Sequence, residues 1–274
     1  MDELLRARAG FVLADVDCDA TPGIAADKRR AEQLLAEGAE HLGALQERLF
    51  AASRSGATQR VLVVLQAMDT AGKGGIVRHV VGAVDPQGVH LTAFKKPTDE
   101  ELAHHFLWRI ERRLPEAGMI GVFDRSHYED VLIGRVRQLA PADEIEQRYG
   151  EIIDFERRLA DDGVSIVKVM LHISRDEQRA RLQERLDRPD KHWKYRPGDI
   201  DERLLWDDYQ AAYQLAIERT DADYAPWYVV PANHKWYARL AVQAQLIAAL
   251  ERIDPQWPLA DFDVEVEKAR LAAT

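Results

Sequence analysis

Apolar and polar residues follow one another along this chain in two distinct patterns, which predict two kinds of element. Continuous apolar runs rich in β-branched residues are typical of strands buried on both faces, as in a parallel sheet. Such runs predict strands at residues 61–65, 89–94, 119–123, 164–173 and 227–230. Apolar residues at helical spacing predict helices at residues 27–53, 98–113, 127–137, 143–159, 174–186, 200–219 and 235–253, with another directly after the first strand. Because strands alternate with helices, we expect an α/β fold with a doubly wound parallel sheet.

The order of these elements suggests how the chain is divided. A length of 274 residues suits one large domain, or a core with an inserted flap. Residues 1–26 contain a break at Thr21-Pro22-Gly23 and are expected to form an N-terminal extension. Residues 187–199 hold two prolines and many charges, which predicts a mobile loop or flap. The tail after residue 253 contains Pro255 and Pro258, and we expect it to wrap the surface of the domain.

Composition narrows the classes of protein that fit. Hydrophobic residues make up 46% of the chain, enough for a sizeable core. A formal net charge of −10 argues against coating a nucleic acid or an anionic membrane with the whole surface, although a local basic groove stays possible. Cys18 is the only cysteine, and no stretch reaches the ~20 apolar residues that a membrane span needs. We therefore expect a cytoplasmic protein with no nucleic-acid or membrane partner.

A glycine-rich turn, QAMDTAGKGG at residues 66–75, follows the first strand and precedes a helix. Such a turn directs backbone N–H groups at one point, and the start of the helix adds partial positive charge, so the turn predicts a phosphate site. Gly72, Gly74 and Gly75 would let the backbone approach the phosphate, and Lys73 would add a full positive charge. The alternative is an ordinary glycine turn with a lysine in solvent.

The turn departs from the general phosphate-loop pattern at two positions. Ala67 replaces the first glycine, and Gly74 replaces the Ser or Thr whose hydroxyl helps to hold Mg²⁺ in many phosphate loops. Another oxygen ligand must then compensate. Asp69, inside the loop, is the obvious candidate because carboxylates suit Mg²⁺, although it could instead cap the turn.

A second acidic position follows the third predicted strand. Asp124 ends that strand, where a metal-binding carboxylate of the Walker B type would lie beside the phosphate loop. Arg125 comes next and can make bidentate contacts to phosphate oxygens. Ser126 is expected to cap the next helix, and His127 is expected to pack rather than to react. The sequence therefore predicts a site made of the loop and this strand end.

Four segments, in this order along the chain, resemble the polyphosphate kinase 2 family. They are QAMDTAGKGG at residues 66–75, KKPT at 95–98, FDRSHYEDVL at 123–132 and KHWKYRPGDIDERLLWDD at 191–208. The similarity extends over roughly residues 30–255. The resemblance implies a single P-loop kinase-like domain over residues 1–274, with a helical lid at about 175–205. It also implies Mg²⁺-dependent transfer of a phosphoryl group between inorganic polyphosphate and a nucleotide.

The resemblance carries roles to individual positions. Lys73 matches the loop lysine of the family, Asp69 the loop aspartate, Asp124 the second acidic residue and Arg125 the arginine that follows it. Asp69 and Asp124 would then act at the metal and at the transferring phosphate. The stretch SHYEDVL resembles the subgroup that acts on both nucleoside mono- and diphosphates, which favours AMP or ADP. The family also implies a homo-oligomer, a dimer or a tetramer.

A basic segment gives independent support for a polyanion. Residues 175–196 contain eight basic and five acidic residues, a local charge of +3 in an acidic chain. Arg179, Arg185 and Arg188 in the lid, with Lys95 and Lys96 after the second strand, are candidate phosphate-binding residues. The alternative is a solvated helix face with ion pairs along the helix.

Two rival functions remain open at this stage. The chain could be an ATP-dependent nucleoside monophosphate kinase of the thymidylate-kinase-like type, since an Asp-Arg pair at a strand end suits that class as well. It could also be a nucleotide-binding switch without phosphoryl transfer. The preferred nucleotide, the favoured direction and the preferred polyphosphate length do not follow from the sequence.

Overall fold

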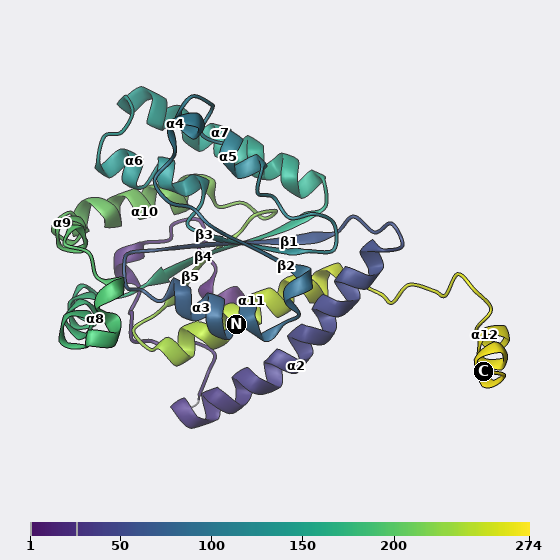
Figure 1. Ribbon diagram of the computed structural model, residues 1–274. Helices are drawn as coiled ribbons and strands as arrows, with labels where there is room; N and C mark the ends of the chain where they lie inside the picture. The colour runs from purple at the N-terminus through teal and green to yellow at the C-terminus, as the bar shows by residue number, and fades with distance from the viewer. Residues whose placement is uncertain (1, 26) are drawn as a thin grey trace.

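A five-stranded parallel sheet forms the centre of the computed structural model, which describes residues 2–25 and 27–274 (Figure 1). The strand order is β2-β3-β1-β4-β5. The strands are β1 Arg60–Ala67, β2 Val89–Ala93, β3 Ile120–Asp124, β4 Val164–His172 and β5 Trp227–Pro231. β1 is central, and its side chains from Val61 onward are buried. The apolar runs of β1, β3, β4 and β5 are buried, whereas β2 at the edge of the sheet is partly exposed. The predicted doubly wound sheet is confirmed.

The parallel register brings the carboxyl ends of the strands to one edge of the sheet. Leu65 of β1 lies opposite Asp124 of β3, and Ala67 lies opposite Leu171 of β4. The turns that follow β1 and β3 consequently begin side by side. In open α/β sheets this edge is where ligands bind.

Helices cover both faces of the sheet (Figure 1). α2, α3 and α11 pack on one face, and α6, α7 and α10 lie on the other with the short α4 and α5. α8 and α9 lie beyond the carboxyl ends of the strands. The helices are α1 Asp2–Leu5, α2 Lys28–Ser53, α3 Lys73–His79, α4 Asp99–Leu102, α5 Trp108–Glu111, α6 Ile133–Val136, α7 Ala142–Asp161, α8 Arg175–Asp187, α9 Gly198–Leu204, α10 Trp206–Thr220, α11 Lys235–Ile253 and α12 Val264–Ala272.

Three helices that were predicted to be continuous are interrupted in the structure. Residues 98–113 form two short helices, α4 and α5, and residues 127–137 form a 3₁₀ turn, His127–Asp130, followed by α6. The predicted helix over 200–219 is broken at Leu205, between α9 and α10. Thr98 and Glu101 form a capping box at the start of α4, but α4 is only four residues long. Side-chain packing therefore overrides the helical periodicity at these places.

The two ends of the chain behave differently. The N-terminal segment lies beside β5, where the amide of Ala7 donates to the carbonyl of Trp227 at 2.8 Å. The C-terminal arm, residues 256–274, extends away from the body and ends in α12 (Figure 1). The expectation that the tail wraps the surface is therefore wrong. No helix in the described part of the chain is long and apolar enough to cross a bilayer.

Candidate active site

The phosphate loop connects the buried strand β1 to α3 at the carboxyl edge of the sheet. Gly72 is the N-cap residue of α3, with a φ of 120° that side chains with a Cβ rarely adopt. The amide of Gly75 donates to the carbonyl of Gly72 at 2.7 Å and starts the helix. Lys73 and Gly74 begin the first turn of α3, and Gly74 is exposed. This is the strand–turn–helix geometry that an anion site requires.

Two crossed ion pairs join this loop to the end of β3. Lys73 Nζ lies 4.0 Å from Asp124 Oδ1, and Arg125 Nη2 lies 3.3 Å from Asp69 Oδ1. Each pair takes one residue from the loop and one from the strand end. The four residues that the sequence singled out therefore meet in one place, although Asp69 and Arg125 are 56 positions apart in the chain.

Arg125 occupies an unusual backbone conformation. Its φ is 64°, in the left-handed region that non-glycine residues seldom adopt, and its amide donates to the carbonyl of Leu65 at 3.1 Å. Burial lowers the pKa of the Arg125 guanidinium, but the carboxylates of Glu129, Asp69 and Asp124 outweigh it and raise the pKa above its ordinary value. Arg125 is thus a fixed positive charge held at the strand end.

Glu129 belongs to this cluster and was not singled out from the sequence. With the Gln66 amide oriented to satisfy its neighbours, Gln66 donates to Glu129 Oε1 at 3.0 Å and accepts from the amide of Ser126 at 3.1 Å. Burial raises the pKa of Glu129, and the nearby charges of Arg125 and Lys73 oppose that rise. Glu129 follows Asp124 by five positions, and this spacing did not predict a shared site. Glu129 joins the cluster because the 3₁₀ turn His127–Asp130 folds the chain back.

The donor set of this cluster fits a magnesium ion. Among the described residues no group of three or more His, Cys, Asp and Glu side chains is arranged to hold a metal by itself. Mg²⁺ commonly binds through one or two carboxylates and completes its shell with water and substrate phosphates. Asp69 and Asp124 offer two such carboxylates. With Glu129 they outnumber Lys73 and Arg125, which leaves the cluster with a net negative charge that a cation can offset.

Ser126 and His127 have structural partners. The Ser126 hydroxyl accepts from the amide of Tyr128, so the predicted cap is confirmed. His127 is fully buried, and its Nε2 lies 3.1 Å from Glu156 Oε1. Lys168, also buried, donates to Glu156 Oε2 at 2.6 Å. These contacts fix the turn that follows Arg125 to α7 and β4.

The candidate phosphate-binding residues outside the loop lie in two regions. Lys95 and Lys96 are exposed after β2, and the carbonyl of Lys95 accepts from Arg109 at 3.0 Å. On α8, Arg179 is exposed. Arg185 donates to Asp199 Oδ2 at 3.2 Å and to the carbonyl of Lys194 at 3.0 Å, and Arg188 donates to Asp190 Oδ2 at 2.7 Å. Arg185 therefore joins α8 to the following segment, whereas Arg188 pairs with its sequence neighbour.

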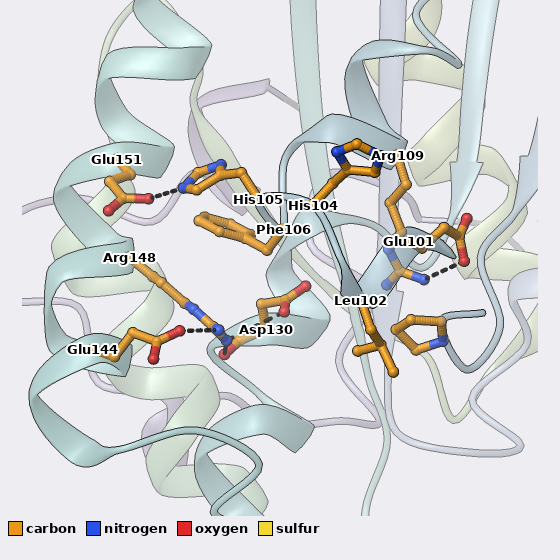
Figure 2. Close-up of a pocket in the computed structure, with 11 residues that line it drawn as sticks. Glu101, Leu102, His104, His105, Phe106, Arg109, Asp130, Glu144, Arg148 and Glu151 are labelled. Carbon is orange, nitrogen blue, oxygen red and sulfur yellow. Dashed lines mark hydrogen bonds and ion pairs between the residues drawn. The ribbon is translucent and has the colours of Figure 1, made fainter. Parts of the chain in front are cut away.

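A separate pocket of 380 Å³ opens between the α4–α5 segment and α7 (Figure 2). Most of its polar side chains are paired with one another. His105 lies 2.8 Å from Glu151, and Arg148 lies between Asp130, at 3.2 Å, and Glu144, at 2.6 Å (Figure 2). None of the four residues of the crossed ion pairs lines this pocket. The candidate site is therefore identified by its charged residues and not by a pocket.

Comparisons with known proteins agree with this geometry. The family model described as polyphosphate kinase 2 matches residues 25–258. The chain is 48% identical over 248 residues to an AMP/ADP-polyphosphate phosphotransferase of Meiothermus ruber, which covers 90% of this chain and 91% of the relative. It is 42% identical over 243 residues to an ADP-polyphosphate phosphotransferase of Rhodopseudomonas palustris, with coverage of 84% and 83%.

A solved structure is similar over almost the whole length. The crystal structure of polyphosphate kinase 2 from Arthrobacter aurescens superposes with a TM-score of 0.98 at 59% identity, and covers 99% of this chain and 96% of that one. The family match spans the phosphate loop, the strand end with Asp124 and Arg125, and α8. The chain belongs to the polyphosphate kinase 2 family and is a phosphotransferase of that type.

Proposed function

We propose that this protein transfers a phosphoryl group between inorganic polyphosphate and AMP or ADP, with Mg²⁺ as its cofactor. The crossed ion pairs carry the proposal, because they place two cations and two carboxylates where a phosphate loop meets a strand end. The named substrates of the relatives from Meiothermus ruber and Rhodopseudomonas palustris support AMP and ADP as acceptors.

The residues of the site have separate tasks in this reaction. Phosphoryl transfer involves little covalent chemistry for the protein, so positioning and electrostatic stabilisation account for most of the rate. Lys73 and Arg125 neutralise charge on the transferring group. Asp69 and Asp124 would hold Mg²⁺, which would supply positive charge that offsets the charge of the phosphates. No covalent intermediate on the protein is needed.

One assay tests this function. The purified protein is incubated with Mg²⁺ and long-chain polyphosphate, together with a panel of nucleoside mono- and diphosphates, and the nucleotide products are separated. We expect new phosphoanhydride products from AMP or ADP without added ATP. Phosphorylation of AMP only when ATP is supplied would instead assign an ATP-dependent kinase. Nucleotide binding without turnover of any donor would assign a switch.

The basic segment on α8 and after it is assigned to the polyphosphate chain. In this proposal residues 175–205 act as a lid over the site, and Lys95 and Lys96, which are exposed after β2, are further candidates for binding the polyphosphate chain. Within this segment the side chain of Arg185 is 22% exposed and pairs with Asp199, and that of Arg188 is 51% exposed. Polyphosphate carries about one negative charge per phosphate, so an acidic protein needs such a local reversal of its field.

Replacing Arg185 and Arg188 together by alanine should raise KM for polyphosphate and lower kcat, with little change in Tm. The effect on KM should shrink at high ionic strength, because salt already screens exposed charges. Steady-state kinetics at two salt concentrations measures both. Arg158→Ala, which removes an exposed arginine on α7, is the matched control. An unchanged KM at low salt would assign α8 to a solvated helix face.

The C-terminal arm supports assembly into a homo-oligomer. Trp257, Leu259 and Phe262 are 56%, 95% and 57% exposed, and α12 has no buried residue. A helix of 9 residues is marginal in water without a surface to pack on. A second copy of the chain would supply that surface.

Removing residues 256–274 should therefore lower the number of chains in each particle in solution. Because the arm extends from the body, the truncated chain should keep its fold and its cooperative unfolding transition. Light scattering after size-exclusion chromatography measures the mass, and circular dichroism checks the fold. An unchanged oligomer of the truncated chain would show that other surfaces hold the copies together.

A further inference from the structure

Arg181 lies beneath the phosphate loop and uses all of its hydrogen-bond donors. It is 5% exposed. Its Nη1 donates to the carbonyls of Thr70 at 3.0 Å and Ala71 at 2.9 Å. Its Nη2 donates to the carbonyls of Ala232 at 2.7 Å and Asn233 at 2.9 Å, and its Nε to Glu177 at 2.6 Å. A guanidinium has five N–H groups, so none of them is left to bind substrate.

Gln178, one turn earlier on α8, extends this contact to the preceding loop residue. Its Nε2 donates to the carbonyl of Asp69 at 3.2 Å. Three consecutive loop carbonyls, those of residues 69, 70 and 71, are therefore turned toward α8. In a planar trans peptide the carbonyl and the next N–H point in opposite directions. Holding these carbonyls consequently turns the amide groups that follow them away from α8, as a phosphate-binding turn requires.

The loop needs such support because its conformation is strained. Thr70 has a φ of 68°, which is unfavourable for a β-branched side chain. Its own hydroxyl does not explain that conformation, since Thr70 Oγ1 is buried without a hydrogen-bond partner among the residues that the structure describes. A strained conformation persists only where the surroundings impose it. The surroundings of Thr70 include the Arg181 guanidinium.

We propose that Arg181 and Gln178 are positioning residues that hold the phosphate loop in its anion-binding conformation. The inference rests on the proposed function, since it concerns the same site. Arg203 of α9 extends the arrangement: its Nη1 donates to Gln178 Oε1 at 3.0 Å and to the carbonyl of Arg175 at 2.6 Å. The lid segment thus contacts the residue that fixes the carbonyl of Asp69.

The test compares Arg181→Met, Arg181→Lys and Gln178→Met with the full-length protein. We expect Arg181→Met to lower kcat/KM by about 10²-fold, as displacement of reacting groups by about 1 Å can do. Arg181→Lys keeps the charge but cannot reach all four carbonyls, so it should recover only part of the loss. Gln178→Met removes one contact without a charge and should give a smaller loss.

A rescue experiment separates positioning from general stability. Glycine adopts a positive φ without strain, so a Thr70→Gly background should depend less on Arg181. We expect the loss caused by Arg181→Met to be several-fold smaller in that background. The control is Arg6→Met, which removes an arginine that pairs with Asp223 at the opposite edge of the sheet. It should lower Tm and leave kcat unchanged.

Binding of inorganic tripolyphosphate, measured by titration calorimetry, keeps the inference testable apart from catalysis. A folded Arg181→Met variant should bind it at least about tenfold more weakly. If the unaltered protein shows no polyphosphate-dependent turnover, the proposed function fails, while the calorimetric comparison still tests the loop. If the unaltered protein is active and the folded Arg181 and Gln178 variants keep its kcat and its affinity, the positioning role is wrong. Should Arg181→Met not fold, Arg181→Lys and Gln178→Met decide by the same two measurements.

Discussion

Replacing Lys73 by alanine should reduce the rate of phosphoryl transfer by at least ~10²-fold and leave the fold intact. The Lys73 side chain is only 11% exposed, and its Nζ lies 3.3 Å from the carbonyl of Ala67 and 4.0 Å from Asp124. It is therefore held at the mouth of the loop as a fixed charge. In the transition state the charge of the transferring group is spread over its three equatorial oxygens, where a fixed cation acts on it, so loss of this cation affects kcat more than substrate binding.

The measurement is steady-state kinetics with polyphosphate and ADP, combined with a thermal unfolding curve of the same preparation. Lys268→Ala is the matched control, because it removes an exposed lysine from α12 that pairs with Glu265. Lys73→Arg keeps the charge with a larger head group and should stay impaired. Turnover close to normal in a folded Lys73→Ala variant would exclude the phosphate loop as the site of transfer.

Replacing Asp124 by asparagine should both lower activity and raise the Mg²⁺ concentration needed for half-maximal rate. Asparagine keeps the size of the side chain but removes the charge that a hard cation prefers. Asp124 is 28% exposed and paired with Lys73, so the substitution also leaves that lysine without its partner. We expect a loss of at least about tenfold in kcat, together with a shift in the Mg²⁺ titration.

A Mg²⁺ titration of the rate at saturating polyphosphate and ADP checks this result. Asp261→Asn removes an exposed carboxylate from the C-terminal arm and should change neither quantity. An Asp124→Asn variant with an unaltered Mg²⁺ profile would mean that Asp124 is structural and that the metal is held elsewhere. The crossed pairing of Asp69 with Arg125 makes Asp69→Asn the next variant to compare.

Much of the fold and the centre of the site could be predicted from the sequence, because both depend on local pattern. Residues 61–65 and 164–173 are continuous apolar runs, and these became the central strands β1 and β4. Parallel strands bring their carboxyl ends together, so the loop after β1 and Asp124 after β3 were bound to meet.

The breaks in the predicted helices depend on contacts between distant parts of the chain. Within residues 98–113, His105 pairs with Glu151 of α7, 46 positions away, and His104 stacks on Trp108 at 4.1 Å. Around Leu205 the chain turns so that Leu204 is 72% exposed while Trp206 is buried. The spacing of apolar residues within a segment gives no information about partners elsewhere in the chain. The lengths of the continuous helices were therefore overestimated.

One residue of α8, Arg181, was missed because charges were counted without regard to the direction of each side chain. Arg179, Arg185 and Arg188 were singled out, but the arginine closest to the loop is Arg181. A signal was available, since Gln178, Arg181 and Leu182 have the spacing of one helix face, and all three are buried. Gln178 and Arg181 are polar residues on the buried face of α8, which follows the strand next to the phosphate loop. Such residues are expected to contact backbone groups rather than solvent.

The strand order also has a consequence for how the chain folds during synthesis. β1 is the central strand, yet its first partner, β3, begins at Ile120 and its second, β4, at Val164. At about 5–20 residues per second, roughly 3–10 s pass between the appearance of β1 and that of β3. During this interval the most apolar strand of the protein is unpaired and prone to associate with other chains. Yields of folded protein should therefore depend on chaperones and temperature during expression more than on the stability of the finished sheet.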